Sequence, residues 1–123
     1  MFYHASNTGG LKQLLPLSVN HDGGKAVCYF TTCRAYALFY LRDMEINHVT
    51  CGMPRDGVVT YYEEFPRQLE KIYGGRSGWL YHCDDNGSIT EGPKSGVWVS
   101  VRPIVVINSE LVDNVYEEIL AAE

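Results

Sequence analysis

The sequence has no cluster of basic residues. Its 10 Lys and Arg are outnumbered by 15 Asp and Glu, so the formal net charge is −5. Proteins that bind duplex nucleic acid by neutralising phosphates have the opposite balance. The charge pattern therefore argues against a duplex nucleic-acid partner. It still permits a small anionic ligand held by a few well-placed donors.

Long apolar runs are also missing. No stretch approaches the roughly 20 apolar residues that span a bilayer. Residues 1–4 show no basic segment followed by an apolar one, as a signal peptide would. We therefore expect a cytoplasmic protein with no membrane partner. In that compartment cysteines are thiols, and the sequence has four: Cys28, Cys33, Cys51 and Cys83.

Several motifs of common chemistry are absent. No Gly-x-Gly-x-x-Gly or Walker loop occurs, and the pairs Gly9-Gly10 and Gly23-Gly24 are too short to cradle phosphates. The potential soft metal ligands are Cys28-x4-Cys33, His48-x2-Cys51 and His82-Cys83. These spacings do not form the paired knuckles typical of structural zinc. No metal is therefore expected, and zinc binding is kept as an alternative, as is a cysteine nucleophile with a histidine base.

The composition predicts one α+β domain over residues 1–123. A hydrophobic fraction of 46% and a charged fraction of 20% are ordinary for a globular chain, and the length fits one domain. Strand and helix signals do not alternate strictly, which argues against a doubly wound parallel sheet. A mixed or antiparallel sheet of about six strands with about four helices is expected instead.

The expected elements follow from apolar spacing and turn residues. Strands are predicted at 1–5, 26–31, 46–51, 58–62, 79–83, 88–90 and 97–107, the last bent at Pro103. Helices are predicted at 11–15, at 33–42 with Thr31 or Thr32 as N-cap, at 66–73, and from Ser109 onward with Leu111, Val115 and Ile119 facing the core. Asn86-Gly87 predicts a hairpin between the strands at 79–83 and 88–90.

One constellation in the first forty residues suggests a function. His4 lies in an apolar strand, where it shares a face with Phe2. A second strand ends in Tyr29-Phe30-Thr31, and the helix after it carries Tyr36 and Tyr40. The feature to be explained is therefore a strand histidine followed by a tyrosine-rich strand and helix.

This order resembles the His-Tyr-Glu branch of the ADP-ribosyltransferase superfamily, to which diphtheria toxin and the poly(ADP-ribose) polymerases belong. The corresponding residues are Tyr3-His4-Ala5-Ser6, Tyr29-Phe30-Thr31, and Ala35-Tyr36 through Tyr40. The resemblance covers about the first third of the chain and implies an ADP-ribosyltransferase-like fold. It also implies NAD as substrate, ADP-ribosyl transfer or NAD hydrolysis as activity, and a possible protein acceptor.

The resemblance assigns a role to each residue. His4 orients the ribose, while the backbone after it, at Ala5 and Ser6, holds the carboxamide. Tyr40 stacks on the nicotinamide, and the pocket walls come from Tyr29, Phe30 and Tyr36. Such a site lowers the barrier to the oxocarbenium-like transition state by holding NAD bent and stabilising the developing charge.

Two features depart from the family pattern. Ala5 stands where the family has Gly, which tightens the approach of a ligand. The family's glutamate has no identifiable motif here, and the available residues are Glu63, Glu64, Glu91, Glu110, Glu117 and Glu118. Glu91, in a loop before a late strand, is the best positional match.

The other glutamates have structural explanations. Glu63 and Glu64 precede a helix start that favours acids, and Glu117 and Glu118 are expected on a solvated helix face.

The alternative function is a non-catalytic ligand-binding or protein-interaction module of the same fold. RNA 2′-phosphotransfer is a lesser alternative, because the chain has few basic residues to hold an RNA phosphate.

Overall fold

The computed structural model describes residues 1–19, 26–41, 50–51, 59–84, 87–92 and 97–122. Within these residues the chain forms ten strands and three helices. The elements are β1 (Phe2–Ser6), β2 (Gln13–Leu14), β3 (Ser18–Val19), β4 (Ala26–Phe30), α1 (Arg34–Leu38), β5 (Thr50–Cys51), β6 (Tyr61–Tyr62), α2 (Gln68–Tyr73), β7 (Gly78–Cys83), β8 (Thr90–Glu91), β9 (Trp98–Ser100), β10 (Ile104–Val112) and α3 (Val115–Ala121).

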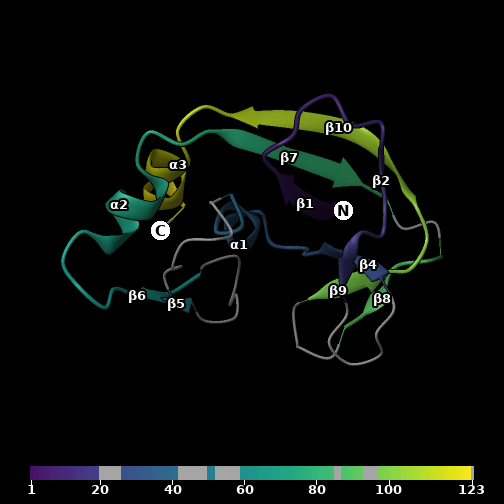
Figure 1. Ribbon diagram of the computed structural model, residues 1–123, viewed down its shortest axis with the longest axis horizontal. Helices are drawn as coiled ribbons and strands as arrows, with labels where there is room; N and C mark the ends of the chain where they lie inside the picture. The colour runs from purple at the N-terminus through teal and green to yellow at the C-terminus, as the bar shows by residue number, and fades with distance from the viewer. Residues whose placement is uncertain (20–25, 42–49, 52–58, 85–86, 93–96, 123) are drawn as a thin grey trace.

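The strands form two four-stranded sheets and a separate pair. The first sheet has the order β1-β7-β10-β2, the second has the order β3-β4-β9-β8, and β5 pairs with β6. A bridge between Tyr3 and Thr31, with N···O distances of 2.7 and 3.0 Å, links β1 to the end of β4. The two sheets thereby curl into half a barrel (Figure 1). The α+β class and the antiparallel pairing are confirmed, but a single sheet of six strands was wrong.

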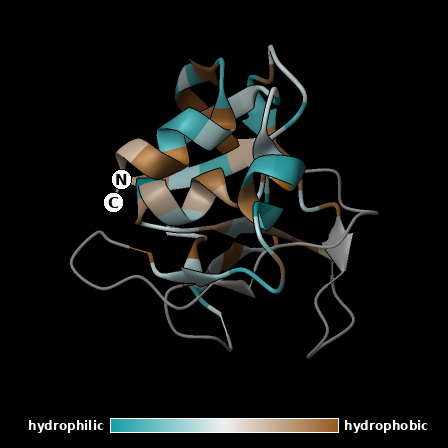
Figure 2. Cartoon of the chain, turned by 90° about the vertical axis from the view of Figure 1, so that its left-hand side faces the viewer, coloured by the Kyte–Doolittle hydropathy of each residue, from teal (hydrophilic) through white to brown (hydrophobic). Residues whose placement is uncertain are grey.

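Two cores lie on opposite faces of the first sheet. Along β7, Leu80 points to one face, while Tyr81 and Cys83 point to the other. The helix-side core contains Leu80 and the buried faces of the three helices. The sheet-side core lies between the two sheets and contains Tyr81, Cys83 and Phe30. Figure 2 shows apolar and polar residues alternating along the helices, as expected where only one face packs.

The helix predicted at 11–15 is wrong. Gln13–Leu14 is the edge strand β2, and Leu14 pairs with Ile104 of β10. Both side chains are buried in the sheet-side core. The apolar stretch was too short for its periodicity to separate a helix from a strand, and pairing with the edge of β10 decided the outcome.

The predicted hairpin is also wrong: its first strand is β7, but the second, predicted at 88–90, is β8 at Thr90–Glu91. β7 is paired on both edges, by β1 and by β10, so it has no edge left for β8. β8 pairs with β9 in the second sheet instead. The Asn-Gly signal reports a local turn and carries no information about competing partners from distant segments. Asn86 itself lies outside the described residues.

The last helix begins later than predicted. Ser109 lies inside β10, which continues to Val112 after a bulge between Val106 and Asn108. The N-cap of α3 is Asn114, whose side chain accepts a hydrogen bond from the backbone N–H of Glu117 at 3.2 Å. Leu111 is exposed, which corrects its predicted core position. Val115 and Ile119 are buried, as expected.

The remaining boundaries are partly confirmed. Pro103 separates β9 from β10, as predicted. The N-cap of α1 is Cys33; Thr31 does not cap the helix and accepts a bond from the Cys33 N–H instead. α2 starts at Gln68, after Arg67 in a left-handed conformation. Residues 46–49 and 58, part of two predicted strands, lie outside the described residues. No helix within the described ranges is long and apolar enough to cross a membrane.

Candidate functional site

His4 sits where the two sheets meet. It lies on β1 opposite Tyr81 of β7, and its Nδ1 is 2.7 Å from the backbone carbonyl oxygen of Tyr29 on β4. A carbonyl only accepts, so Nδ1 carries the proton and donates. In the neutral imidazole Nε2 is then an acceptor. The second sheet therefore fixes both the orientation and the tautomer of His4.

The surroundings keep His4 neutral. Burial lowers its pKa, partly offset by the bond to the Tyr29 carbonyl. The Phe30 ring lies 5.8 Å away between centroids, and the Cys28 Sγ lies 3.5 Å from Nδ1. An apolar wall disfavours the imidazolium. His4 is thus a preset hydrogen-bond acceptor at neutral pH.

The cysteines beside His4 are poor nucleophiles. Burial raises the pKa of the Cys28 thiol to about 12, with a contribution from Cys83, whose own pKa is raised by burial to about 11. A thiolate is the reactive form. The contact between Cys28 and His4 therefore does not support a cysteine–histidine catalytic pair. Cys28, Cys33 and Cys83 are free thiols, as expected, and Cys51 is not described beyond its backbone.

Glu91 shares a sheet face with the aromatic wall of His4. Phe30 pairs with Trp98, and Trp98 pairs with Glu91, so the three side chains point the same way. Phe2 adds an edge contact to Trp98, with centroids 5.4 Å apart. Two strand spacings put the Glu91 backbone about 10 Å from that of Phe30. His4 and Glu91 thus stand at the two ends of an aromatic row and are not paired with each other.

The other predicted pocket residues do not all point to the side of His4. Strand alternation turns the Tyr29 side chain away from Cys28 and Phe30, so the part of Tyr29 that reaches His4 is its carbonyl. Ser6 shares the His4 face, and its hydroxyl accepts a bond from the Thr8 N–H at 3.1 Å. Ala5 packs on the helix-side core instead.

The structure brings Tyr36 and Tyr40 into contact with each other. Their ring centroids are 5.5 Å apart and their hydroxyls 3.3 Å apart. Tyr36 is buried in the helix-side core, across β1 from His4, whereas Tyr40 is 41% exposed. Tyr40 is therefore the exposed ring of the pair, and the structure does not bring it together with His4, which lies on the other side of β1.

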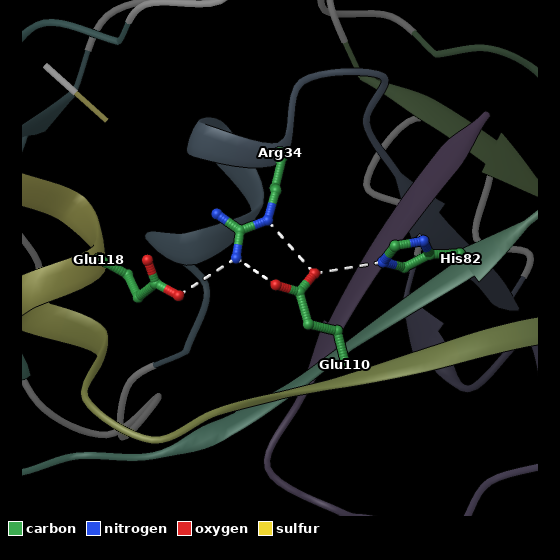
Figure 3. A network of polar contacts seen from close by, with 4 residues as sticks. All are labelled: Arg34, His82, Glu110 and Glu118. Atoms are coloured by element: carbon green, nitrogen blue, oxygen red, sulfur yellow. Dashed lines mark hydrogen bonds and ion pairs between the residues drawn. The ribbon is translucent and has the colours of Figure 1, made fainter. Parts of the chain in front are cut away.

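A polar network on the helix side was missed by the sequence analysis (Figure 3). The Arg34 guanidinium donates to Glu110 through Nε at 3.2 Å and through Nη2, and also to Glu118 at 3.3 Å. The Glu110 carboxylate also lies 3.3 Å from Nε2 of His82. The His82 ring contacts Tyr3 with centroids 5.0 Å apart. Glu118, expected on a solvated helix face, has a side chain that is 40% exposed and also forms an ion pair with Arg34.

Glu63 behaves as the sequence suggested. Its carboxylate accepts a bond from the Leu69 N–H at 3.0 Å, in the first turn of α2. The neighbouring Glu64 donates its backbone N–H to the buried side chain of Gln68 at 2.7 Å. These contacts explain the Glu63-Glu64 pair by the start of α2.

The network makes the stability of the folded chain depend on pH. The pKa of Glu110 is lowered from 4.5, first by the hydrogen bond from Arg34, with burial opposing and His82 assisting. The stabilisation is therefore complete above the unfolded-state pKa and is lost as the pH falls through the lower folded-state value. We expect Glu110→Gln to be less stable than wild type at pH 7 and the gap to narrow on acidification below pH 4.5.

Urea unfolding at a series of pH values measures that gap. Glu117→Gln, on the same helix as Glu118 but outside the network, is the control. A gap for Glu110→Gln that stays constant from pH 7 to pH 3 would contradict the role of this carboxylate.

The described residues contain no group of three or more His, Cys, Asp or Glu side chains arranged to hold a metal ion. The pair His48 and Cys51 is not tested by this statement, because His48 is outside the described ranges. Comparison of the chain with protein-family models, with curated proteins and with solved structures finds no match.

Proposed function

We propose that the chain binds a ribose-containing dinucleotide of the NAD class, with His4 as the residue that holds a ribose hydroxyl. The observation that supports this is the bond of 2.7 Å from His4 Nδ1 to the Tyr29 carbonyl. This bond uses the donor nitrogen, Nδ1, within the protein and leaves Nε2 as an acceptor with a fixed orientation. A ribose hydroxyl donates to such an atom without reorganising the site, which favours binding.

The resemblance to ADP-ribosyltransferases supports the same ligand class. It rests on the order of His4, Tyr29 and Tyr40 along the chain. In the fold, Tyr40 packs on Tyr36 on the helix side, across β1 from His4, so the ring beside a ribose held by His4 is that of Phe30. NAD or an ADP-ribose-like molecule offers both a ribose and a planar base that can stack on an aromatic ring.

Catalysis is the second candidate, and the position of Glu91 favours it. In transfer or hydrolysis the bond between nicotinamide and ribose breaks, and nicotinamide leaves with the bonding electrons. An acceptor or water then bonds to the ribose carbon and loses a proton. Glu91 points to the same side as Phe30 and Trp98, so a ligand lying along this aromatic row reaches from His4 toward its carboxylate. Binding ranks before catalysis because catalysis in this family uses a glutamate beside the histidine. Among the described residues, no ion pair joins His4 to a carboxylate.

Isothermal calorimetry with NAD⁺ and with ADP-ribose tests the proposal on wild type, His4→Asn and His4→Gln. The asparagine amide can donate to the Tyr29 carbonyl but has no atom at the position of Nε2. We expect His4→Asn to weaken binding about tenfold, the worth of one hydrogen bond of about 1–1.5 kcal/mol. His4→Gln, which restores a polar atom near Nε2, should recover part of the loss.

His82→Gln is the matched control, because His82 lies on the same sheet but on its helix-side face. It should bind as wild type does. If folded wild-type protein binds neither compound, or if His4→Asn binds as well as wild type, the proposal fails. Release of free nicotinamide that Glu91→Gln abolishes would establish the enzyme, and binding without release would establish the module.

A further inference from the structure

The row of aromatic rings beside His4 reaches the surface at Trp98. Phe30, which pairs with Trp98, is 3% exposed, whereas Trp98 is half-buried. The Phe2 ring packs edge-on against Trp98, with centroids 5.4 Å apart and an interplanar angle of 67°. Glu91, on the last strand of the second sheet, pairs with Trp98 and is exposed. An indole ring and a carboxylate therefore lie side by side at the outer end of this row.

This end of the row has no cation beside it among the described residues. No ion pair in these ranges includes Glu91, and no cation–π contact in them includes Trp98. The face of an indole ring carries partial negative charge and attracts cations. A carboxylate next to that face adds to the attraction. In a chain of net charge −5, these two groups favour a planar ligand that carries positive charge.

We propose that Trp98 and Glu91 bind the nicotinamide ring of oxidised NAD, and that the site thereby selects NAD⁺ over NADH. This inference rests on the proposed binding of the NAD class at His4. The nicotinamide ring of NAD⁺ is a planar pyridinium with a positive charge, whereas in NADH the ring is neutral and no longer aromatic. Only the oxidised ring places a positive charge over the indole face and beside the carboxylate.

The spacing of the row suits this arrangement. The ring centroids of His4 and Phe30 are 5.8 Å apart. Trp98 is on the strand next to that of Phe30, and neighbouring strands lie about 5 Å apart. The nicotinamide and its ribose are joined by a single bond. A ribose held at Nε2 of His4 therefore lies beside Phe30, and its nicotinamide extends toward Trp98.

In this role Glu91 favours binding and opposes catalysis. When the bond from nicotinamide to ribose breaks, the ring takes the bonding electrons and becomes neutral. The attraction between the ring and Glu91 is then weaker in the transition state than in the bound substrate. An interaction that is stronger with the bound substrate raises the barrier to reaction. The charge of Glu91 at this position thus supports the non-catalytic module, which distinguishes the two oxidation states of NAD.

Calorimetry with NAD⁺ and with NADH on wild type, Glu91→Gln and Glu117→Gln tests the inference. We expect wild type to bind NAD⁺ about tenfold more tightly than NADH, from one cation–π contact and one exposed ion pair together. Glu91→Gln removes the charge and keeps the shape, so the preference should fall to about threefold or less. Glu117→Gln, the same change of charge at an exposed position on α3, should keep the full preference.

The outcomes separate this inference from the proposed function. Equal affinity of wild type for the two nucleotides, or tighter binding of NADH, would overturn the inference and leave ligand binding at His4 intact. A preference that Glu91→Gln retains in full, or that Glu117→Gln also removes, would overturn it as well. If the folded wild type binds neither nucleotide, the proposed function fails and this inference fails with it.

Discussion

Leu80→Ala is expected to lower the free energy of unfolding by about 2–5 kcal/mol. Leu80 lies on β7, the central strand that joins β1 to β10, and its side chain is fully buried in the helix-side core. Truncation removes apolar contacts within the helix-side core and leaves a cavity that a strand paired on both edges cannot close. The free energy of unfolding of a native protein is about 5–15 kcal/mol, so this loss is a large fraction of the total.

Urea unfolding followed by tryptophan fluorescence measures the effect, with Leu17→Ala as the control. Leu17 is 80% exposed, so its truncation should change stability by about 0.5 kcal/mol or less. Equal effects for the two variants would mean that Leu80 is not packed as described.

Tyr73→Phe is expected to cost about 1–3 kcal/mol. The Tyr73 side chain, on α2, is fully buried, and its hydroxyl donates to the Phe39 carbonyl at 2.7 Å. That carbonyl belongs to the C-cap of α1, where backbone acceptors have no partner within the helix. Removing the hydroxyl leaves the Phe39 carbonyl oxygen buried without this hydrogen bond, so the loss of stability exceeds that from losing an exposed hydrogen bond.

Tyr62→Phe controls for the chemical change itself, because Tyr62 is exposed. Thermal and urea unfolding should separate the two variants clearly. If Tyr73→Phe is as stable as wild type, the contact between the two helices does not contribute in the way described.

The sequence predicted those elements whose signals are local. Alternation and β-branched residues located β1, β4 and β7, and Pro103 located the break before β10. It failed where distant segments compete for the same strand. The stretch at 11–15 became β2 because the edge of β10 was available, and the Asn-Gly hairpin did not form because β1 and β10 occupy both edges of β7.

The candidate site shows the same division. Residue types identified His4 and the tyrosines, but only strand pairing shows that Tyr29 reaches His4 through its carbonyl. The face of a strand also decides which residues meet, so Tyr36 falls on the helix side. The network of Arg34, His82 and Glu110 spans segments up to 76 residues apart, and no spacing rule connects them.

The chemical shifts of the His4 ring nitrogens, measured by NMR on ¹⁵N-labelled protein with and without NAD⁺, test the central claim most directly. Free His4 should show the tautomer protonated at Nδ1 and stay neutral at pH 7. Addition of NAD⁺ should then shift the Nε2 resonance and leave Nδ1 and the His82 ring nearly unchanged. A His4 protonated at Nε2, or a saturating NAD⁺ complex with an unchanged Nε2 resonance, would contradict the account.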